Sequence, residues 1–337
     1  MSENILTVKD LKTYFYTASG VAKAVDGVSF NIAKGETMGI VGESGSGKSV
    51  TSSSIIRLLP PRTGKIVGGS IEFEGKDVLA LSKKELNDFR GKDIAVVFQD
   101  PMTSLDPVFK IGKQMTEMIM AHQNVTKDEA WKMAVEALSK VGIPEPEKRM
   151  NSYPYELSGG MCQRVIIAMA VCCKPKLIIA DEPTTALDVT VQAQVLELLK
   201  DLQRNMDTAI LLITHNLGVV WEMCDKVMVM YAGNTVEFAD TKTLYSNPRH
   251  PYTWGLLDSM PKLSDESKGE LKTIPGTPPD LRLTGKCCNF YNRCPYVTEA
   301  CTQSVPPLVE VEPGHFVACH RQNLTNKLEK GEGLKDE

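Results

Sequence analysis

The chain has 337 residues and a net charge of −4, with 42% apolar and 24% charged residues. This composition is typical of a soluble globular protein, and the length predicts one large domain plus a smaller piece. The charge argues against broad electrostatic binding to nucleic acid, and no apolar run reaches the length of a bilayer-spanning helix. Because residues 1–10 lack an apolar signal core, we expect a cytoplasmic protein that reaches membranes only through a partner.

Three adjacent aromatic residues, Tyr14, Phe15 and Tyr16, lie between predicted strands at residues 6–8 and 25–32. They precede a glycine-rich loop that could bind a nucleotide, so one ring could stack on the base. They could equally be ordinary strand residues, and the sequence does not separate the two interpretations. We choose Phe15 as the stacking residue, with Tyr14 and Tyr16 as alternatives.

Residues 42–49 match the phosphate-loop pattern G-x-x-x-x-G-K-[ST]. A predicted buried strand at 37–41 precedes the loop, and a helix from residue 50 to Leu59 follows it, stopped by two prolines. Glycines let backbone N–H groups surround phosphate oxygens, and the helix N-terminus adds positive charge. Lys48 can reach the β- and γ-phosphates, and Ser49 can bind Mg²⁺. The complete pattern disfavours a plain glycine turn. The predicted phosphate-binding residues are Gly42, Glu43, Ser44, Gly45, Ser46, Gly47, Lys48 and Ser49.

Gln99 follows a predicted buried strand at residues 94–98. An amide at the carboxyl end of such a strand is well placed to reach Mg²⁺ or an attacking water. Taken alone, a capping glutamine is the simpler interpretation.

The pattern turns helical from residue 100 to about 175, with an amphipathic stripe that starts at Trp131. Near its end, Leu157, Ser158, Gly159 and Gly160 precede an apolar helix. A serine and two glycines at a helix start form a second anion-binding corner, although an ordinary N-cap has the same composition.

Two acidic residues, Asp181 and Glu182, follow a short apolar strand at residues 177–180. Asp181 can hold Mg²⁺ through its water shell, and Glu182 can take a proton from an attacking water. Asp188 lies in the next turn. His215 follows another core strand, at 209–213, where contact with the γ-phosphate is a better interpretation than a purely structural histidine.

These motifs, in this order, resemble the nucleotide-binding subunit of ABC transporters over residues 5–245. The resemblance implies an α/β fold of the P-loop NTPase type, with a RecA-like core, a mixed sheet and an inserted helical subdomain at about 100–175. It also implies two ATPases arranged head to tail, each closing over the ATP of the other. The residues that would face the partner's ATP are Leu157, Ser158, Gly159, Gly160 and Asp188.

A narrower resemblance, to the ATPase subunits of oligopeptide and dipeptide importers, rests on residues 99–107, 247–252, 273–279 and 293–295. It divides the chain into an ATPase domain at 1–247, an importer-type extension at 248–325 and a charged tail at 326–337. The chain departs from the family at Cys162, where relatives usually have arginine or another polar residue, and at Asn216, where aspartate is usual. Neither position is catalytic.

Nine cysteines in a chain without an export signal predict no disulfides. The spacing C-x5-C-x6-C-x17-C joins Cys288, Cys294, Cys301 and Cys319. Four thiolates can hold a [4Fe–4S] cluster or a zinc ion. The importer extension, which this spacing resembles, implies the iron–sulfur cluster, and zinc is the alternative. We expect a structural role, because this segment has weak apolar periodicity and would gain folding energy from a metal.

The sequence therefore predicts an ATP hydrolase that powers peptide import through membrane permease subunits, served by an extracytoplasmic substrate-binding protein. It would lie at the cytoplasmic face of the membrane, pair with a second ATPase, as a heterodimer rather than a homodimer, and bind no nucleic acid. The alternatives are import of nickel, sugar or another small solute, and a soluble ABC ATPase outside transport. The predicted catalytic residues are Glu182, His215 and Gln99, and the predicted Mg²⁺ ligands are Ser49, Gln99 and Asp181.

Overall fold

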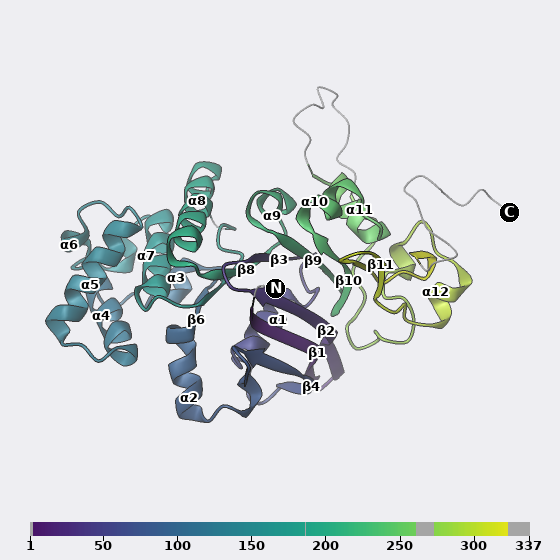
Figure 1. The fold of residues 1–337 in the computed structure, drawn as a ribbon, viewed down its shortest axis with the longest axis horizontal. Coiled ribbons are helices and arrows are strands. Elements are labelled where there is room, and N and C mark those ends of the chain that lie inside the picture. The colour runs from purple at the N-terminus through teal and green to yellow at the C-terminus, as the bar shows by residue number, and fades with distance from the viewer. Residues whose placement is uncertain (1–2, 186, 261–272, 323–337) are drawn as a thin grey trace, which may run out of the picture. The chain divides into compact units, whose positions relative to one another are not determined.

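The computed structural model describes residues 3–185, 187–260 and 273–322 (Figure 1). The chain divides into two compact units. The first unit comprises Met1–Ile5, Ile32–Glu36 and Ala80–Leu212, and the second comprises Leu6–Asn31, Thr37–Leu79 and Ile213–Glu337. None of the described helices is both long enough and apolar enough to cross a bilayer.

A four-stranded sheet forms one layer of the second unit. Its strand order is β2 (Gly20–Ala33), β1 (Asn4–Thr17), β4 (Gly64–Phe73) and β5 (Lys76–Asp77). β1 and β4 are antiparallel, with Leu6 opposite Phe73 and Phe15 opposite Gly64. The strands predicted at residues 6–8 and 25–32 lie within β1 and β2, which are both longer than the prediction.

The second unit also contains a mixed sheet. β3 (Thr37–Val41) runs parallel to β9 (Lys226–Tyr231), which pairs antiparallel with β10 (Asn234–Asp240). Every residue of β3 is buried, which explains its mostly apolar sequence. A Cβ on Gly39 of β3 would lie 3.0 Å from Cys224 Sγ and 3.1 Å from Val220, so glycine lets the chain around α9 (Leu217–Met223) pack directly on this strand.

The predicted importer-type extension adds strands to this mixed sheet. β12 (His315–Val317) pairs with β10, and β11 (Val309–Glu312) pairs with β12. The buried carboxylate of Glu237, in β10, accepts hydrogen bonds from the backbone N–H groups of Arg249 (2.7 Å) and His250 (3.0 Å) and contacts His315 Nε2 at 2.8 Å. The extension therefore has protein contacts that hold it to β10. Its helices and the neighbouring one are α10 (Thr241–Ser246), α11 (Pro251–Asp258) and α12 (Glu299–Gln303).

The first unit combines a parallel strand pair with the helical region. β6 (Ile94–Val97) is parallel to β7 (Leu177–Asp181), and β8 (Ala209–Thr214) neighbours β7. The helices between β6 and β7 lie where the sequence predicts the helical segment, and Figure 1 shows them grouped together. The unit's helices are α2 (Lys83–Asp88), α3 (Pro101–Ser104), α4 (Ile111–His122), α5 (Lys127–Lys140), α6 (Pro146–Arg149), α7 (Gly159–Cys172) and α8 (Val189–Met206).

Candidate active site

The phosphate-loop residues connect β3 to α1 (Lys48–Ile55) in the second unit. Gly42 has φ 153° and Gly47 has φ 106°, which L side chains rarely adopt. A Cβ would lie 2.2 Å from the Met230 carbonyl oxygen at position 42 and 2.3 Å from the Ala24 carbonyl oxygen at position 47. Helix α1 begins at Lys48, two residues earlier than predicted, so Lys48 and Ser49 lie in its first turn.

The polar side chains of this loop fit an anion ligand. Lys48 is 5% exposed, and its Nζ donates to the carbonyl oxygens of Gly42 (2.8 Å) and Glu43 (3.0 Å), which keeps the ammonium within the loop. Ser46 Oγ is buried and has no hydrogen-bond partner in the described part of the chain. A buried hydroxyl without a partner costs free energy, which a bound phosphate oxygen would recover. Ser49 is exposed beside them.

The three aromatic residues of β1 differ in their contacts. Tyr14 donates its hydroxyl to Asp26 Oδ1 at 2.7 Å, and the exposed Tyr16 ring has Lys65 Nζ 5.3 Å from its centroid. Thr13 is hydrogen-bonded to Ser54 of α1 through their buried hydroxyls at 2.8 Å, so this face of β1 points at the helix that follows the phosphate loop. Phe15, two residues further, is on the same face. The contacts favour Phe15, whose role stays a prediction.

Gln99 and Glu182 come together in the first unit. Each follows one of two neighbouring parallel strands, β6 and β7, whose carboxyl ends share one edge of the sheet. Gln99 Nε2 donates to Glu182 Oε2 at 3.0 Å, and Thr185 Oγ1 donates to the same oxygen at 2.9 Å. Glu182 has φ 48°, in the left-handed region, directly after Asp181 at the end of β7. The structure thus orients one carboxylate with two donors at a strained backbone position.

The predicted second anion-binding corner lies at the N-terminus of α7. Ser158 caps this helix by accepting from the Met161 N–H at 3.3 Å, and both Ser158 and Gly159 are exposed whereas Leu157 is buried. A Cβ on Gly160 would lie 2.6 Å from Cγ1 of Val191, in the first turn of α8. That helix is capped by Asp188, which accepts from the Val191 N–H at 3.0 Å. Val191 therefore links the α7 start to Asp188, both predicted to face a partner's nucleotide.

His215 follows β8 and is exposed. The next residue, Asn216, caps α9 by accepting from the N–H groups of Gly218 (2.9 Å) and Val219 (3.4 Å). Asparagine therefore provides a helix cap at the position where the sequence departs from the family. The other departure, Cys162, is fully buried in α7, with Sγ 3.4 Å from the Pro154 carbonyl oxygen.

Sequence reasoning missed two residues that hold the phosphate loop. Arg293 makes a bidentate ion pair with Glu43, at 2.6 Å (Nη1–Oε2) and 2.9 Å (Nη2–Oε1). The Tyr252 hydroxyl accepts from the Glu43 backbone N–H at 2.8 Å. From the sequence, Arg293 and Tyr252 are recognisable only as members of segments that resemble the importer family. Spacing along the chain could not reveal their contact with position 43.

The structure does not support the predicted iron–sulfur site. All nine cysteines are free, and the described residues include no group of three or more cysteine, histidine or acidic side chains arranged to hold a metal ion. The four predicted ligands nevertheless lie in one neighbourhood. The Cys288 N–H donates to the Cys301 carbonyl oxygen (3.0 Å), and the Tyr296 N–H lies 3.4 Å from Cys294 Sγ. Burial, reinforced by the neighbouring thiols, raises the pKa of Cys288 to about 12 and of Cys294 and Cys319 to about 11.

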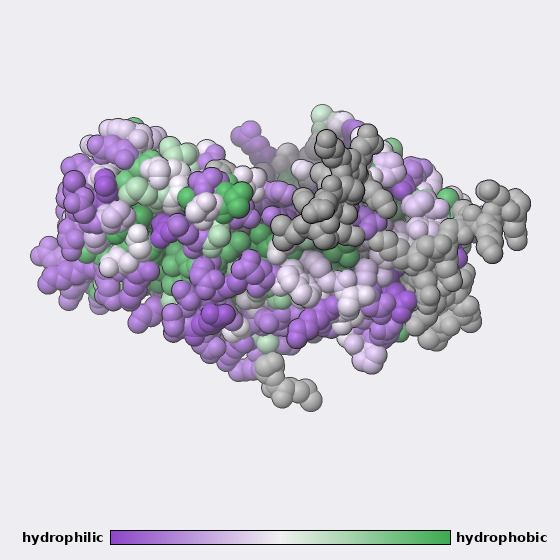
Figure 2. Space-filling model, turned by 90° about the horizontal axis from the view of Figure 1, so that it is seen from above, coloured by the Kyte–Doolittle hydropathy of each residue, from purple (hydrophilic) through white to green (hydrophobic). Residues whose placement is uncertain are grey.

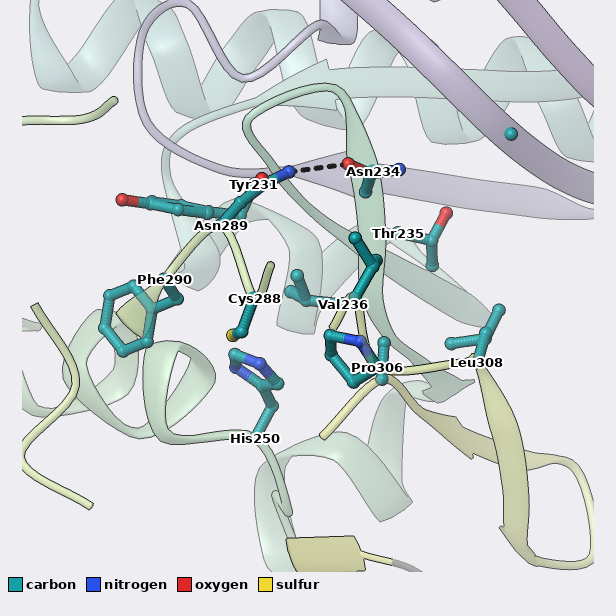
Figure 3. A pocket seen from close by; sticks show the side chains of 13 residues that line it. Tyr231, Asn234, Thr235, Val236, His250, Cys288, Asn289, Phe290, Pro306 and Leu308 are labelled. Atoms are coloured by element: carbon teal, nitrogen blue, oxygen red, sulfur yellow. Dashed lines mark hydrogen bonds between the residues drawn. The ribbon is translucent and has the colours of Figure 1, made fainter. Parts of the chain in front are cut away.

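Cys288 also lines a cavity of about 140 Å³ in the second unit (Figure 3). Its side chain faces the His250 ring across this cavity. His250 Nδ1 accepts from the Tyr252 N–H at 3.0 Å, and burial lowers the pKa of His250 to about 4. Asn289, which also lines the cavity, donates to Asn234 Oδ1 at 2.8 Å. Two histidines of the extension have partners of their own, Glu237 for His315 and the Ser304 carbonyl oxygen for His320.

Comparison with known proteins identifies two family matches, ABC transporter at residues 25–185 and oligopeptide/dipeptide transporter C-terminal region at 236–301. The oligopeptide transport ATP-binding protein OppD of Bacillus subtilis is 54% identical over 93% of this chain and 87% of its own length. OppD of Escherichia coli is 50% identical over 95% of this chain and 94% of its own. A dipeptide counterpart, DppD of B. subtilis, is 49% identical over 95% and 96%.

Solved ATP-binding cassettes share the fold. The cassette MJ0796, in a dimeric post-hydrolysis state with ADP and phosphate, is 27% identical with a TM-score of 0.63, covering 70% of this chain and 98% of its own. CbiO1 of Clostridium perfringens, part of the transporter complex cbiONQ, is 29% identical with a TM-score of 0.62, covering 73% and 92%.

Proposed function

The chain belongs to the ATP-binding subunits of ABC transporters of the oligopeptide and dipeptide class. On that premise we propose how its residues bind and hydrolyse ATP. It is an ATP hydrolase that powers peptide import through membrane permease subunits, together with a partner ATPase, at the cytoplasmic face of the membrane. The observation that carries the mechanism is the Glu182 carboxylate, held by Gln99 and Thr185 at the end of a core strand.

We propose that the phosphate loop binds the triphosphate of ATP. Lys48 would contact the β- and γ-phosphates, the Ser46 hydroxyl would gain an acceptor, and the N–H groups at the start of α1 would surround the anion. Phe15 would stack on the adenine. Mg²⁺ would be held by Ser49, Gln99 and Asp181, and when bound it neutralises charge on the phosphates.

Glu182 would act as the general base for the attacking water. Its carboxylate is directed by two donors, so it has a fixed orientation and needs little rearrangement to accept a proton. Gln99 contacts this carboxylate directly, so its amide is also placed to contact the attacking water. His215 would hold the γ-phosphate from the end of β8.

The exposed starts of α7 and α8 would close over the ATP of the partner ATPase. We propose that Ser158, Gly159, Gly160 and Asp188 form this surface together with Leu157, whose side chain is buried, and that Val189, which is 84% exposed, belongs to the same surface. We propose a heterodimer with a related ATPase. Mass measurement of the co-expressed complex tests this, because two copies of this chain alone would contradict it.

Apolar side chains exposed on both sides of Gln99 in the sequence mark a candidate contact with the permeases. Phe98, Met102, Val108 and Phe109 are between 39% and 70% exposed. Apolar patches of this kind interrupt the hydrophilic surface drawn in Figure 2. Exposed apolar side chains of this kind favour a protein partner. They would pass the movement of the ATPases to the membrane subunits.

We keep the metal centre as a proposal, in which Cys288, Cys294, Cys301 and Cys319 hold a [4Fe–4S] cluster, with zinc as the alternative. Four thiols in one neighbourhood and an N–H directed at Cys294 Sγ support it. The centre would cross-link the extension. Elemental analysis of protein purified without oxygen tests the proposal. Zinc without iron would overturn the cluster, and neither metal would overturn the centre.

The function is tested by reconstituting the chain with its permeases, its partner ATPase and the extracytoplasmic substrate-binding protein that we propose for the complex. We expect ATP hydrolysis to be stimulated by peptide-loaded binding protein and to drive peptide uptake. Stimulation by nickel or sugar and not by peptide would instead establish another cargo for the same type of ATPase.

A further inference from the structure

The importer-type extension contacts the phosphate loop at Glu43 from two directions. Arg293 holds both carboxylate oxygens, and Tyr252 accepts from the backbone N–H of the same residue. Glu43 occupies a variable position of the phosphate-loop pattern, where the chemistry of ATP binding does not require a carboxylate. Its side chain therefore has a different task from the glycines, Lys48 and Ser49.

Arg293 is itself held rigidly. Its Nε donates to the Pro275 carbonyl oxygen at 2.8 Å, Nη2 lies 3.3 Å from the Ile274 carbonyl oxygen, and Nη1 lies 3.4 Å from the Tyr231 hydroxyl. Its side chain is only 4% exposed. A planar guanidinium can make these bonds together with a bidentate carboxylate pair, whereas a lysine ammonium cannot reproduce the geometry.

The extension also lies against the middle of the loop. A small crevice is lined by phosphate-loop residues 43–46 on one side and by Pro278, Pro279 and Leu281 on the other. Prolines restrict the backbone on the extension side, while glycines make the loop the more mobile partner. The stiffer segment therefore limits the conformations open to the loop.

From these contacts we propose that Arg293 and Tyr252 are positioning residues of the nucleotide site, through which the extension holds the phosphate loop ready for ATP. The proposal rests on the proposed binding of ATP at this loop. A glycine-rich loop loses conformational entropy when it closes on an anion. Contacts that order the loop beforehand reduce that loss and so strengthen binding. They touch no reacting atom, so they should act on ATP affinity more than on the rate of hydrolysis.

The test compares ATP binding and steady-state hydrolysis by the full chain within its transporter complex. We expect Arg293→Gln to raise KM and the ATP dissociation constant about tenfold, a loss of about 1.4 kcal/mol, with kcat nearly unchanged. Arg293→Lys should recover part of the affinity, and Tyr252→Phe should cost less than Arg293→Gln. Arg282→Gln is the matched control, because Arg282 pairs with Asp280 in the same extension. It should leave KM unchanged.

Glu43→Gln tests the same link from the loop side, without altering the extension, and so remains informative if Arg293 variants fold poorly. The Glu43→Gln/Arg293→Gln double variant should bind ATP no worse than either single variant. Unchanged affinity in Arg293→Gln and Glu43→Gln, or additive losses in the double variant, would overturn the proposal. The Lys48→Ala variant distinguishes failure of this proposal from failure of the proposed function. If Lys48→Ala also binds ATP normally, the proposal that ATP binds at this loop is wrong.

Discussion

Glu182 illustrates what single residues contribute to the site. A non-glycine residue in the left-handed region costs about 1–3 kcal/mol, so the surrounding structure must impose the conformation at φ 48°. Hydrogen bonds from Gln99 and Thr185 then fix the direction of the carboxylate. A base that is already oriented needs little reorganisation when a water molecule attacks.

We therefore expect Glu182→Gln to retain ATP binding and to lose turnover by about 10²–10⁴-fold, the usual contribution of a general base. The amide keeps the size and one acceptor oxygen but cannot take the proton. Single-turnover hydrolysis and nucleotide binding are the measurements, and Glu147→Gln, which changes an exposed carboxylate on α6, is the control. Hydrolysis at a near-normal rate would remove Glu182 from this role.

Phe15 carries a second prediction at the scale of one residue. Stacking of a base on an aromatic ring contributes about 1–3 kcal/mol, so Phe15→Ala should weaken ATP binding about tenfold, whereas Phe15→Tyr should retain it. Tyr16→Ala is the matched control, because that ring is 43% exposed near Lys65. Titration with ATP measures both. Loss of ATP binding in Tyr16→Ala but not in Phe15→Ala would show that Tyr16, and not Phe15, stacks on the adenine.

Among the elements, buried strands could be predicted from the sequence most closely. β3, β7 and β8 match their predicted positions to within one residue at each end, because each is a short apolar run that ends in glycine or polar residues. Helix α1 starts two residues earlier than predicted. Its N-cap is Gly47 with a left-handed backbone and no side-chain hydrogen bond, so no capping residue marked the boundary.

Long-range contacts could not be predicted. Glu43 and Arg293 are 250 residues apart, and a bidentate pair between them leaves no periodic trace in the sequence. The pairing of β12 with β10 could not be predicted either, because β12 has only three residues and so shows no strand pattern in the sequence. Gln99 and Glu182 could be linked only because both follow strand-like runs, although the sequence could not supply their hydrogen bond.

The contact between α7 and α8 yields a prediction at the scale of elements. Gly160→Ala should destabilise the chain by about 1–3 kcal/mol, because the new methyl group would meet Val191 at 2.6 Å. Gly160→Ala/Val191→Ala should recover most of this loss. Gly159→Ala is the control for stability, since nothing lies within 4 Å of a Cβ there. Thermal unfolding measures all three, and equal stability of both glycine variants would contradict the packing.

At the scale of the whole molecule, the chain has two separate surfaces suited to phosphate. One is the phosphate loop, with glycines at positions where a Cβ would collide with backbone. The other is the exposed start of α7, linked through Val191 to the cap of α8. A chain with both can bind one nucleotide and cover another. We propose that each ATP site is complete only when two ATPases meet, which would couple ATP occupancy to movement of the permeases.

The most direct test is a structure of the assembled transporter that carries Glu182→Gln and is trapped with Mg·ATP. We expect Lys48 and Ser49 of this chain to contact one triphosphate, while Ser158 and Gly159 contact the γ-phosphate of the ATP bound to the partner ATPase. Density that places residues 157–160 away from every triphosphate would contradict the account.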